Sequence, residues 1–270
     1  MISIEGYSFR SILVVAVLPL LWILETRLPF FLEHQNPRER IQHDAKNISF
    51  GILNASLVAW PISAALAASA AWSQGAAFGI LHRLGLPQLP TTCLAFLLLD
   101  LWMYLWHRAN HGLPFLWRFH KMHHSDAEMS ASTGVRFHTG EVLLSALARL
   151  VIVPVLGITL AQLAIYELVL LPAVLIQHSN VVWPGWFKRA RRMFVTPEMH
   201  RIHHSRWPLD TNSNYGSIFT WWDFLGRTFH GAPIAEPSRP GLNELDDAAS
   251  RSWTGMLRTP FRRIPKRFGS

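Results

Sequence analysis

Two copies of the pattern His-x-x-His-His stand in this chain, and a histidine pair comes shortly before the first copy. These residues are His107, His111, His120, His123, His124, His200, His203 and His204. Positions i, i+3 and i+4 lie on one face of a helix, so we expect each copy to direct three imidazoles toward one point. Neutral imidazole is a favoured ligand of iron, zinc, copper and nickel. The ligands are too many for one tetrahedral ion, and their count suggests a site for two metals.

Coincidence is a poor explanation of the repeated pattern. Histidine fills 14 of the 270 positions. At that frequency one copy of the pattern is expected roughly 0.04 times in a chain of this length, and two copies far less often. The two copies therefore predict a metal site with a low risk of a false match.

Two further histidines stand alone in the sequence but flank the same apolar stretch. His138 precedes this stretch and His178 follows it. A lone histidine is more often a structural or surface residue, yet polar residues at membrane depth are usually functional. We therefore expect each of them to be a ligand or to lie next to one. Four histidines have no such context and are left out of the site: His34, His43, His82 and His230.

Two carboxylates are candidates to support the imidazoles. The first follows from the stripe Asp100, Tyr104, His107 and His111, which has the helical spacing i, i+4, i+7 and i+11. A histidine that binds metal through one nitrogen usually donates its other N–H to a carboxylate or carbonyl, and Asp100 suits that role. The alternative is that Asp100 pairs with Arg108 at the membrane interface. Asp223 is the second candidate, with a surface salt bridge as its alternative.

The absence of several known sequence motifs excludes other classes of catalytic and binding site. The single cysteine, Cys93, excludes a disulfide framework and an iron–sulfur cluster ligated within the chain. The sequence has no His-Glu-x-x-His of zincin proteases, no Gly-x-Ser-x-Gly serine elbow, no P-loop and no dinucleotide-binding glycine motif. It also lacks the signatures of nucleic-acid binding, so its net charge of +8 is better explained by basic loops beside membrane spans.

The elements that must position these residues are apolar and long. Hydrophobic residues make up 50% of the chain and charged residues only 16%, a composition typical of a membrane protein. Apolar runs cover residues 12–24, 48–72, 91–106 and 150–176. The first is short and resembles a signal segment, but no cleavage site follows it, so we interpret it as a retained anchor. The second is long enough to span a bilayer, and the third leads directly into the histidine pair.

The last apolar run is longer than one span needs. If His138 and His178 serve the same site, the segment between them must leave and return to the same side of the membrane. A helical hairpin from near Val142 to near Gln177 satisfies this condition, with Gly157 and its neighbours as the turn. Lysine and arginine concentrate in the loops that carry the histidines, which places these loops on the cytoplasmic side.

Short helices should carry the histidine patterns along the membrane surface. Gly112-Leu113-Pro114 ends one helix, and residues 115–124 can begin another. Thr196-Pro197-Glu198 has the composition of a helix start, with threonine at the cap and proline at the first position. The fold class predicted is an all-α integral membrane protein. It combines transmembrane helices, including a helical hairpin, with a cytoplasmic helical cap that carries the histidines.

Composition divides the chain into three parts. Residues 1–90 form N-terminal membrane-anchor helices, and residues 91–232 form a catalytic domain that holds every candidate ligand. Residues 233–270 form a basic, proline-rich tail, which we expect to be weakly ordered.

With these motifs in hand, the chain resembles the fatty acid hydroxylase / sterol desaturase superfamily of integral-membrane, non-haem diiron enzymes. The matching segments are Asp100 with His107 to His111, His120 to His124, Arg136 to His138, His178 to Asn180, His200 to His204, and Trp222-Asp223 with Gly226 to Thr228. The resemblance covers about residues 94–229. Two departures, the absence of a histidine four residues from His178 and Thr139 in place of a common proline, argue against the fatty-acyl 2-hydroxylase subgroup.

The resemblance implies two iron ions, dioxygen as co-substrate, and hydroxylation or desaturation of a lipid C–H bond. It implies as ligands His107, His111, His120, His123, His124, His178, His200, His203 and His204, with His138 as a tenth. Since the chain has no flavin, haem or cluster site, electrons must come from a separate ferredoxin, cytochrome or reductase. A membrane metal transporter and a non-catalytic relative are the alternatives. Transport sites usually lie near the bilayer midplane, whereas these histidines lie at span ends.

Overall fold

The structure, a computed structural model, describes residues 16–32, 36–234 and 238–262. Within these ranges its regular structure is helical, apart from isolated β-bridges. The longer helices are α2 (Pro37–Asn54), α3 (Trp60–Gly75), α5 (Gln88–Gly112), α7 (Thr139–Leu156) and α8 (Leu160–His178). The shorter helices are α4 (Ile80–Arg83), α6 (Pro114–His124), α9 (Gly185–Arg189), α10 (Pro197–His203), α11 (Pro208–Thr211), α12 (Trp221–Leu225) and α13 (Trp253–Leu257).

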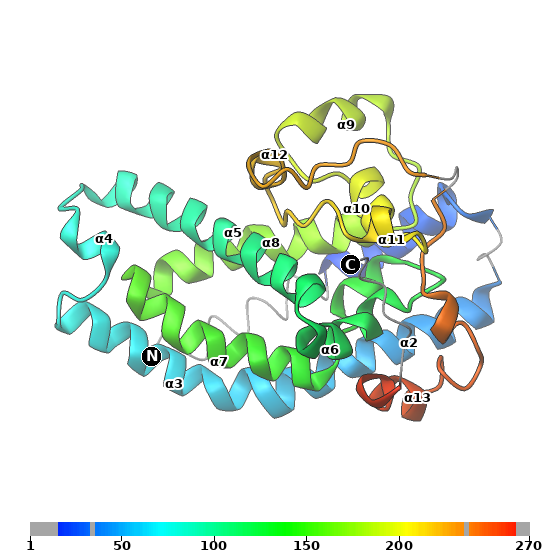
Figure 1. The fold of residues 1–270 in the computed structure, drawn as a ribbon, viewed down its shortest axis with the longest axis horizontal. Coiled ribbons are helices and arrows are strands. Elements are labelled where there is room, and N and C mark those ends of the chain that lie inside the picture. Colours follow the sequence, from blue (N-terminus) through cyan, green and yellow to red (C-terminus); the bar gives the residue numbers. More distant parts are fainter. Residues whose placement is uncertain (1–15, 33–35, 235–237, 263–270) are drawn as a thin grey trace.

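The molecule has a long apolar end and a compact polar end. In Figure 1, α3, α5, α7 and α8 extend to the left, and the short helices α6 and α9 to α13 lie between the centre and the right. Four helical stretches of the described chain are long and apolar enough to cross a membrane: Pro37–Arg83, Gln88–Gly112, Thr139–Leu156 and Leu160–His178. They expose large apolar side chains such as Trp60, Leu89 and Val151, as helices that face lipid do.

The apolar runs of the sequence are helices in the structure, but their limits differ. Runs 48–72 and 91–106 lie inside the first two candidate spans. Residues 12–15 of the expected anchor lie outside the described residues, and residues 16–27 are helical. This helix buries Leu21 against Ala131 and Leu175, so it packs directly onto the part of the molecule that carries the histidines.

The long fourth run is divided into α7 and α8 by a three-residue turn. Gly157 adopts a left-handed conformation with φ of 77°, which glycine reaches without the steric cost that other residues would have. Thr159 then caps α8, because its hydroxyl accepts from the Gln162 backbone N–H while the Gln162 side chain accepts from the Thr159 N–H. Helix α7 packs against α3, and α8 packs against α5 and the 3-10 turn η3 (Ala131–Val135).

Two predicted helix starts are confirmed. Helix α5 ends at Gly112, Leu113 is extended, and α6 begins at Pro114. Helix α10 begins at Pro197, and the hydroxyl of Thr196 accepts from the backbone N–H of Met199. These two short helices carry the two His-x-x-His-His patterns.

The C-terminal tail is better packed than its composition suggests. Leu242 and Leu245 are buried against Trp117, and Met256 is buried against Met122. Tail residues thus cover helix α6, which carries the first histidine pattern. The expectation of a weakly ordered tail is therefore wrong for residues 238–262, because apolar side chains in this proline-rich segment pack against the helices.

Candidate metal centre

The structure gathers nine histidines into two adjacent groups. The five-histidine group comprises His107, His111, His120, His124 and His203, and the four-histidine group comprises His123, His178, His200 and His204. Within each group the potential ligand nitrogens all lie within 4.8 Å of one another. The groups touch where the rings of His124 and His204 stack, with centroids 4.3 Å apart. Eight of the nine side chains are buried, and His107 is partly exposed.

Each His-x-x-His-His pattern contributes to both groups. In α6, His120 and His124 enter the five-histidine group, and His123 enters the other. In α10 the assignment is reversed: the first and last histidines enter the four-histidine group, and His203 enters the five-histidine group. Positions i and i+4 lie 40° apart around a helix, whereas i+3 and i+4 lie 100° apart. The expectation of three imidazoles directed to one point is therefore wrong, because the third one turns to the neighbouring group.

Backbone carbonyls fix the orientation of four imidazoles through Nδ1. The pairs are His107 with Tyr215 (3.0 Å), His123 with Arg136 (3.2 Å), His178 with Val174 (2.7 Å) and His203 with Ser213 (2.7 Å). A carbonyl oxygen only accepts, so each of these Nδ1 atoms carries the proton. In a neutral imidazole the Nε2 atom then offers its lone pair to the interior of the site.

The Nε2 atoms face one another at short distances. They are 3.0 Å apart for His107 and His203, 3.1 Å for His123 and His178, 2.9 Å for His178 and His200, and 3.1 Å for His111 and His124. Two lone pairs at this separation repel unless a cation lies between them. Metal–nitrogen bonds of about 2.1 Å at right angles would place neighbouring ligands about 3.0 Å apart. The donor set and its spacing therefore fit bound metal ions.

Some buried nitrogens have no hydrogen-bond partner among the described residues. They include Nε2 of His120 and both ring nitrogens of His204. A buried polar atom without a partner costs free energy, and native proteins rarely keep one without a reason. Metal coordination would satisfy these atoms.

Burial favours the neutral form of five imidazoles at the short helices α6 and α10. It lowers the pKa of His203 to about 3. Burial, together with the neighbouring imidazoles, also holds the pKa values of His123, His124, His200 and His204 well below their ordinary value. At neutral pH these side chains are in the form that binds metal.

Glu141 is a supporting carboxylate that sequence reasoning missed. Its Oε1 accepts from Nδ1 of His120 at 2.7 Å, the second-sphere contact expected for a metal-binding histidine. It lies in the first turn of α7. One signal was present in the sequence, since Glu141 is a lone carboxylate at the start of a long apolar helix, where a charge is costly without a partner.

A buried polar network holds the first pattern in place. The guanidinium of Arg136 donates to the carbonyl of Met122 at 3.2 Å and to Oγ of Ser125 at 3.1 Å. Asp126 accepts from Nε2 of His43 at 2.8 Å. His43, which sequence analysis left out of the site, therefore connects α2 to the loop after α6.

His138 lies outside both groups, contrary to the expectation of a tenth ligand. It caps α7, and its Nδ1 accepts from the backbone N–H of Gly140 at 3.0 Å. Its Nε2 lies 3.2 Å from the carbonyl oxygen of Leu257, to which it donates. Both ring nitrogens are thus used in structural hydrogen bonds. The flanking position of His138 explains the prediction, but its imidazole points to the C-terminal tail.

The two predicted aspartates accept hydrogen bonds from backbone N–H groups and from side chains other than histidine. Asp100 accepts from the Tyr166 hydroxyl, the Trp222 indole and the backbone N–H groups of Ile218 and Phe219, at 2.8–3.1 Å. No hydrogen bond joins it to a histidine in the described chain. Its position on the stripe of the histidine pair places it against the segment before α12 instead.

Asp223 contacts a histidine indirectly, through the backbone of Tyr215. It accepts from the backbone N–H groups of Tyr215 and Gly216 at 2.8 and 2.9 Å, and from the Thr228 hydroxyl at 2.7 Å. The carbonyl of the same Tyr215 residue accepts from His107. Asp223 therefore positions the peptide that orients His107.

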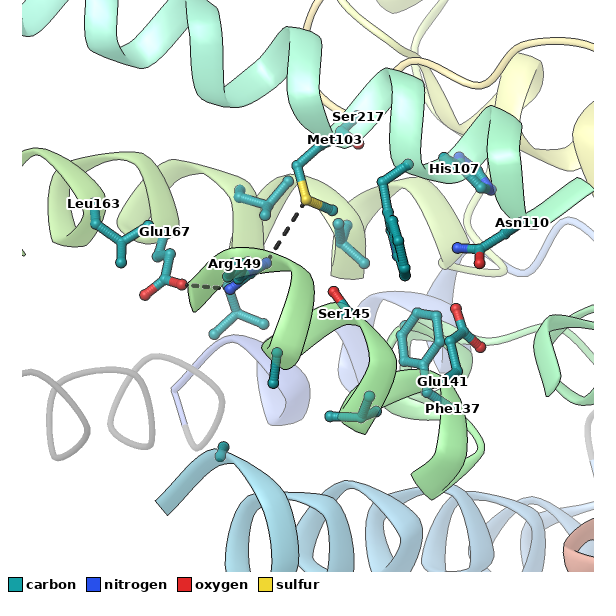
Figure 2. A pocket seen from close by; sticks show the side chains of 18 of the residues that line it. Met103, His107, Asn110, Phe137, Glu141, Ser145, Arg149, Leu163, Glu167 and Ser217 are labelled. Atoms are coloured by element: carbon teal, nitrogen blue, oxygen red, sulfur yellow. Dashed lines mark hydrogen bonds and ion pairs between the residues drawn. The ribbon is translucent and has the colours of Figure 1, made fainter. Parts of the chain in front are cut away.

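An apolar pocket of about 590 Å³ leads from the histidines into the bundle of α3, α5, α7 and α8. Its lining includes His107, His120, His123, His178 and His200 at one end, and leucine side chains of α8 along its length. Arg149 and Glu167 form an ion pair of 2.8 Å across it (Figure 2). Such a slot suits a long apolar ligand with one end beside the metal site.

Comparisons with known proteins agree with this architecture. The family model described as "Fatty acid hydroxylase" matches residues 92–228, which include both histidine groups. The ornithine lipid hydroxylase OlsE of Rhizobium tropici is 30% identical over 171 residues, 63% of this chain and 50% of that protein. Alkylglycerol monooxygenase of Caenorhabditis elegans is 31% identical over 147 residues, 53% of this chain and 28% of that protein.

A more distant relative is the cholesterol 25-hydroxylase of Mus musculus, 26% identical over 153 residues, 53% of this chain and 48% of that protein. The chain thus spans half or less of the length of these relatives. No solved structure matches it significantly. Since the family model covers about half of the chain and every histidine of both groups, the chain belongs to the fatty acid hydroxylase family.

Proposed function

We propose that this protein is a membrane-bound diiron oxygenase that uses dioxygen and external electrons to hydroxylate a lipid C–H bond. The observation that carries the proposal is the position of the two histidine groups at the end of an apolar pocket. Relatives named as lipid hydroxylases and monooxygenases support the same reaction class. Their names do not favour the alternative of a metal transporter.

The nine histidines would hold two irons, one in each group. When bound, the irons supply the redox chemistry with dioxygen that no side chain of the described site can supply. The chain itself does three things. Carbonyls and Glu141 orient the imidazoles, the pocket holds the reacting carbon beside them, and the apolar walls exclude water.

The pocket sets the kind of substrate. Side chains such as Leu66, Leu163 and Leu171 line it, so a long hydrocarbon portion is expected to lie along α3 and α8. Its location among helices able to cross a membrane lets a lipid enter without leaving the bilayer. The same pocket would also accommodate a lipid that is desaturated, with a C=C bond formed at the reacting carbon in place of an alcohol.

We propose an orientation with the histidine end in the cytoplasm. Helices α7 and α8 then act as the predicted hairpin, which enters from and returns to the cytoplasmic side. The short helices form the cap, residues 1–90 anchor the protein, and residues 91–232 form the catalytic domain. The exposed Lys188 and the arginines that follow it in α9 and η4 (Ala190–Arg192) support this orientation and could guide an acidic electron carrier.

The proposal is tested by isotope transfer. The purified, iron-loaded protein is supplied with a chemical or enzymatic reductant, extracted membrane lipids and ¹⁸O₂. We expect one lipid class to gain a single ¹⁸O atom, seen by mass spectrometry, and His123→Ala to abolish the gain. Dioxygen consumption without labelled lipid or a new C=C bond would contradict the proposal, as would zinc-only protein that moves zinc across vesicles.

A further inference from the structure

Two buried acceptor atoms in the pocket have no hydrogen-bond partner among the described residues. One is Oδ1 of Asn110, a residue only 2% exposed. The other is Oε2 of Glu141, 6% exposed, whose Oε1 is taken by His120. Both residues line the pocket.

These atoms lie at the histidine end. Asn110 follows His107 by three residues on α5, so the two side chains share a helix face. Figure 2 shows His107, Asn110 and Glu141 at the same end of the pocket, away from Arg149 and Glu167. Both acceptor residues therefore lie at the end of the pocket that the histidines line.

The protein leaves these acceptors unsatisfied at a cost in stability. Burying an unpaired polar atom is unfavourable, and a site that does so favours ligands that bring the missing partner. Most other groups along the pocket walls are apolar, as the side chains of Ile62 and Leu66 on α3 illustrate. The charged pair farther along the pocket, Arg149 and Glu167, is engaged in its own ion pair at 2.8 Å, so the unpartnered acceptors mark the histidine end for a donor of the ligand.

We infer that Asn110 and Glu141 receive a hydroxyl or N–H group of the lipid, and that the oxidised carbon lies within a few bonds of it. This inference rests on the proposed function and names its substrate class. The substrate is an amphiphile whose donor-bearing polar group lies beside the histidines and whose chain extends along α8. Oxidation then takes place near the polar group and not at the far end of the chain.

The inference is tested by binding of matched probes to the metal-loaded protein in detergent. The probes are 1-dodecanol, N-dodecylacetamide and methyl dodecyl ether, which share a chain but differ in donors. Their dissociation constants come from the ligand-dependent shift of the unfolding temperature. We expect the alcohol, the amide or both to bind at least about tenfold more tightly than the ether, because a hydrogen bond to a charged acceptor is strong. The stronger of the two identifies the donor as O–H or N–H.

Two variants test whether Asn110 and Glu141 cause the tighter binding of the donor-bearing probes. The quantity compared is the donor-to-ether ratio, the affinity of the tighter-binding donor probe divided by that of the ether. Asn110→Leu should reduce this ratio several-fold. Glu141→Gln should reduce this ratio further. The amide oxygen must accept from His120, so its NH₂ group replaces the acceptor in the pocket and can donate to the oxygen of all three probes alike. Each ratio is measured within one preparation, so differences in metal content cancel.

Asn54→Leu is the matched control. Oδ1 of Asn54 is also buried without a partner, but the residue does not line the pocket, and its Nδ2 donates to the Phe137 carbonyl at 2.8 Å. This variant should lose thermal stability and keep the wild-type ratio. Equal binding of all probes to the wild type, or a ratio unchanged in both Asn110→Leu and Glu141→Gln, would overturn the inference. Neither result would affect ¹⁸O transfer to lipid, so failure of the proposed function is detected separately.

Discussion

The two histidine groups differ in how they are held. In the five-histidine group, His120 is fixed by the Glu141 carboxylate, and His107 and His203 by backbone carbonyls. In the four-histidine group the Nδ1 contacts of His123 and His178 are to backbone carbonyls. The first group thus has a spare ligand and a charged supporting residue, and the second has neither in the described chain.

This difference suggests that the two groups differ in how well they retain metal after the loss of one ligand. A carboxylate partner raises the basicity of an imidazole ligand, whereas a carbonyl mainly orients it. The five-histidine group should retain its metal when one ligand is lost, and the four-histidine group should not. Both groups reach the pocket, so loss of either metal should still stop the reaction.

The largest expected effect follows removal of His204. His204→Ala leaves three ligands in its group, and we expect the metal content to fall by about half and product formation by at least about 100-fold. His111→Ala leaves four ligands in the other group and should retain most of its metal. Elemental analysis of both variants checks this. Equal metal loss in the two would show that the spare ligand has no effect.

The second effect is on acid stability of the metal-free protein. The pKa of His203 is about 3 in the folded chain, and those of four other histidines are also lowered. The unfolded chain takes up protons near pH 6.5 that the folded chain refuses, so stability falls as the pH drops below about 6.5. Each such histidine contributes at most about 1.4 kcal/mol per pH unit.

Thermal unfolding between pH 7.5 and 4.5 measures this dependence. The metal-loaded protein should show a smaller loss until protons displace the metal. A metal-free protein whose unfolding temperature is flat over this range would contradict the buried, neutral state of these imidazoles.

A smaller effect on metal affinity is expected from Glu141, the carboxylate that supports only the five-histidine group. Glu141→Gln preserves the hydrogen bond to His120 but removes the charge, and should weaken metal binding in the five-histidine group by about 10- to 100-fold. Chelator competition measures the affinity. Glu167→Gln is the control, since Glu167 lines the same pocket but pairs with Arg149. A similar loss in both variants would point to a general effect of charge in the pocket.

The smallest effect concerns Asp223, which reaches the same group through the Tyr215 peptide. Asp223→Asn cannot accept from both Tyr215 and Gly216, so we expect a stability loss of about 1–3 kcal/mol. Metal affinity should fall only a few-fold, and only in the five-histidine group. Denaturant unfolding and metal titration check the two parts. An affinity loss as large as that of Glu141→Gln would contradict this ordering.

The sequence predicted the elements of the site better than its internal contacts. Helical spacing and apolar runs located α5, α6 and α10, because helix caps and breakers act locally. All nine histidines that the structure gathers were among the candidates. Spacing alone did not show that His123 joins the four-histidine group while the other two histidines of its pattern join the five-histidine group. Nor did it show the reverse for His203, since both assignments depend on how α6 and α10 face each other.

Residues whose role depends on tertiary contacts were predicted least well. Glu141 has no motif around it, and its function appears only when α7 lies against α6. His138 has a ligand-like place in the sequence, yet a helix cap and a tail carbonyl occupy its nitrogens. The tail itself was misjudged because composition does not reveal which few apolar side chains find a partner.

In the proposed site nine histidines bind two iron ions side by side, one ion in each histidine group. Native mass spectrometry of the intact protein, purified from iron-replete cells and released from detergent, tests it directly. We expect the main species to exceed the metal-free mass by two iron ions, and His204→Ala to shift the main species to one iron ion. A wild-type protein that carries a single metal ion, or zinc alone, would contradict it.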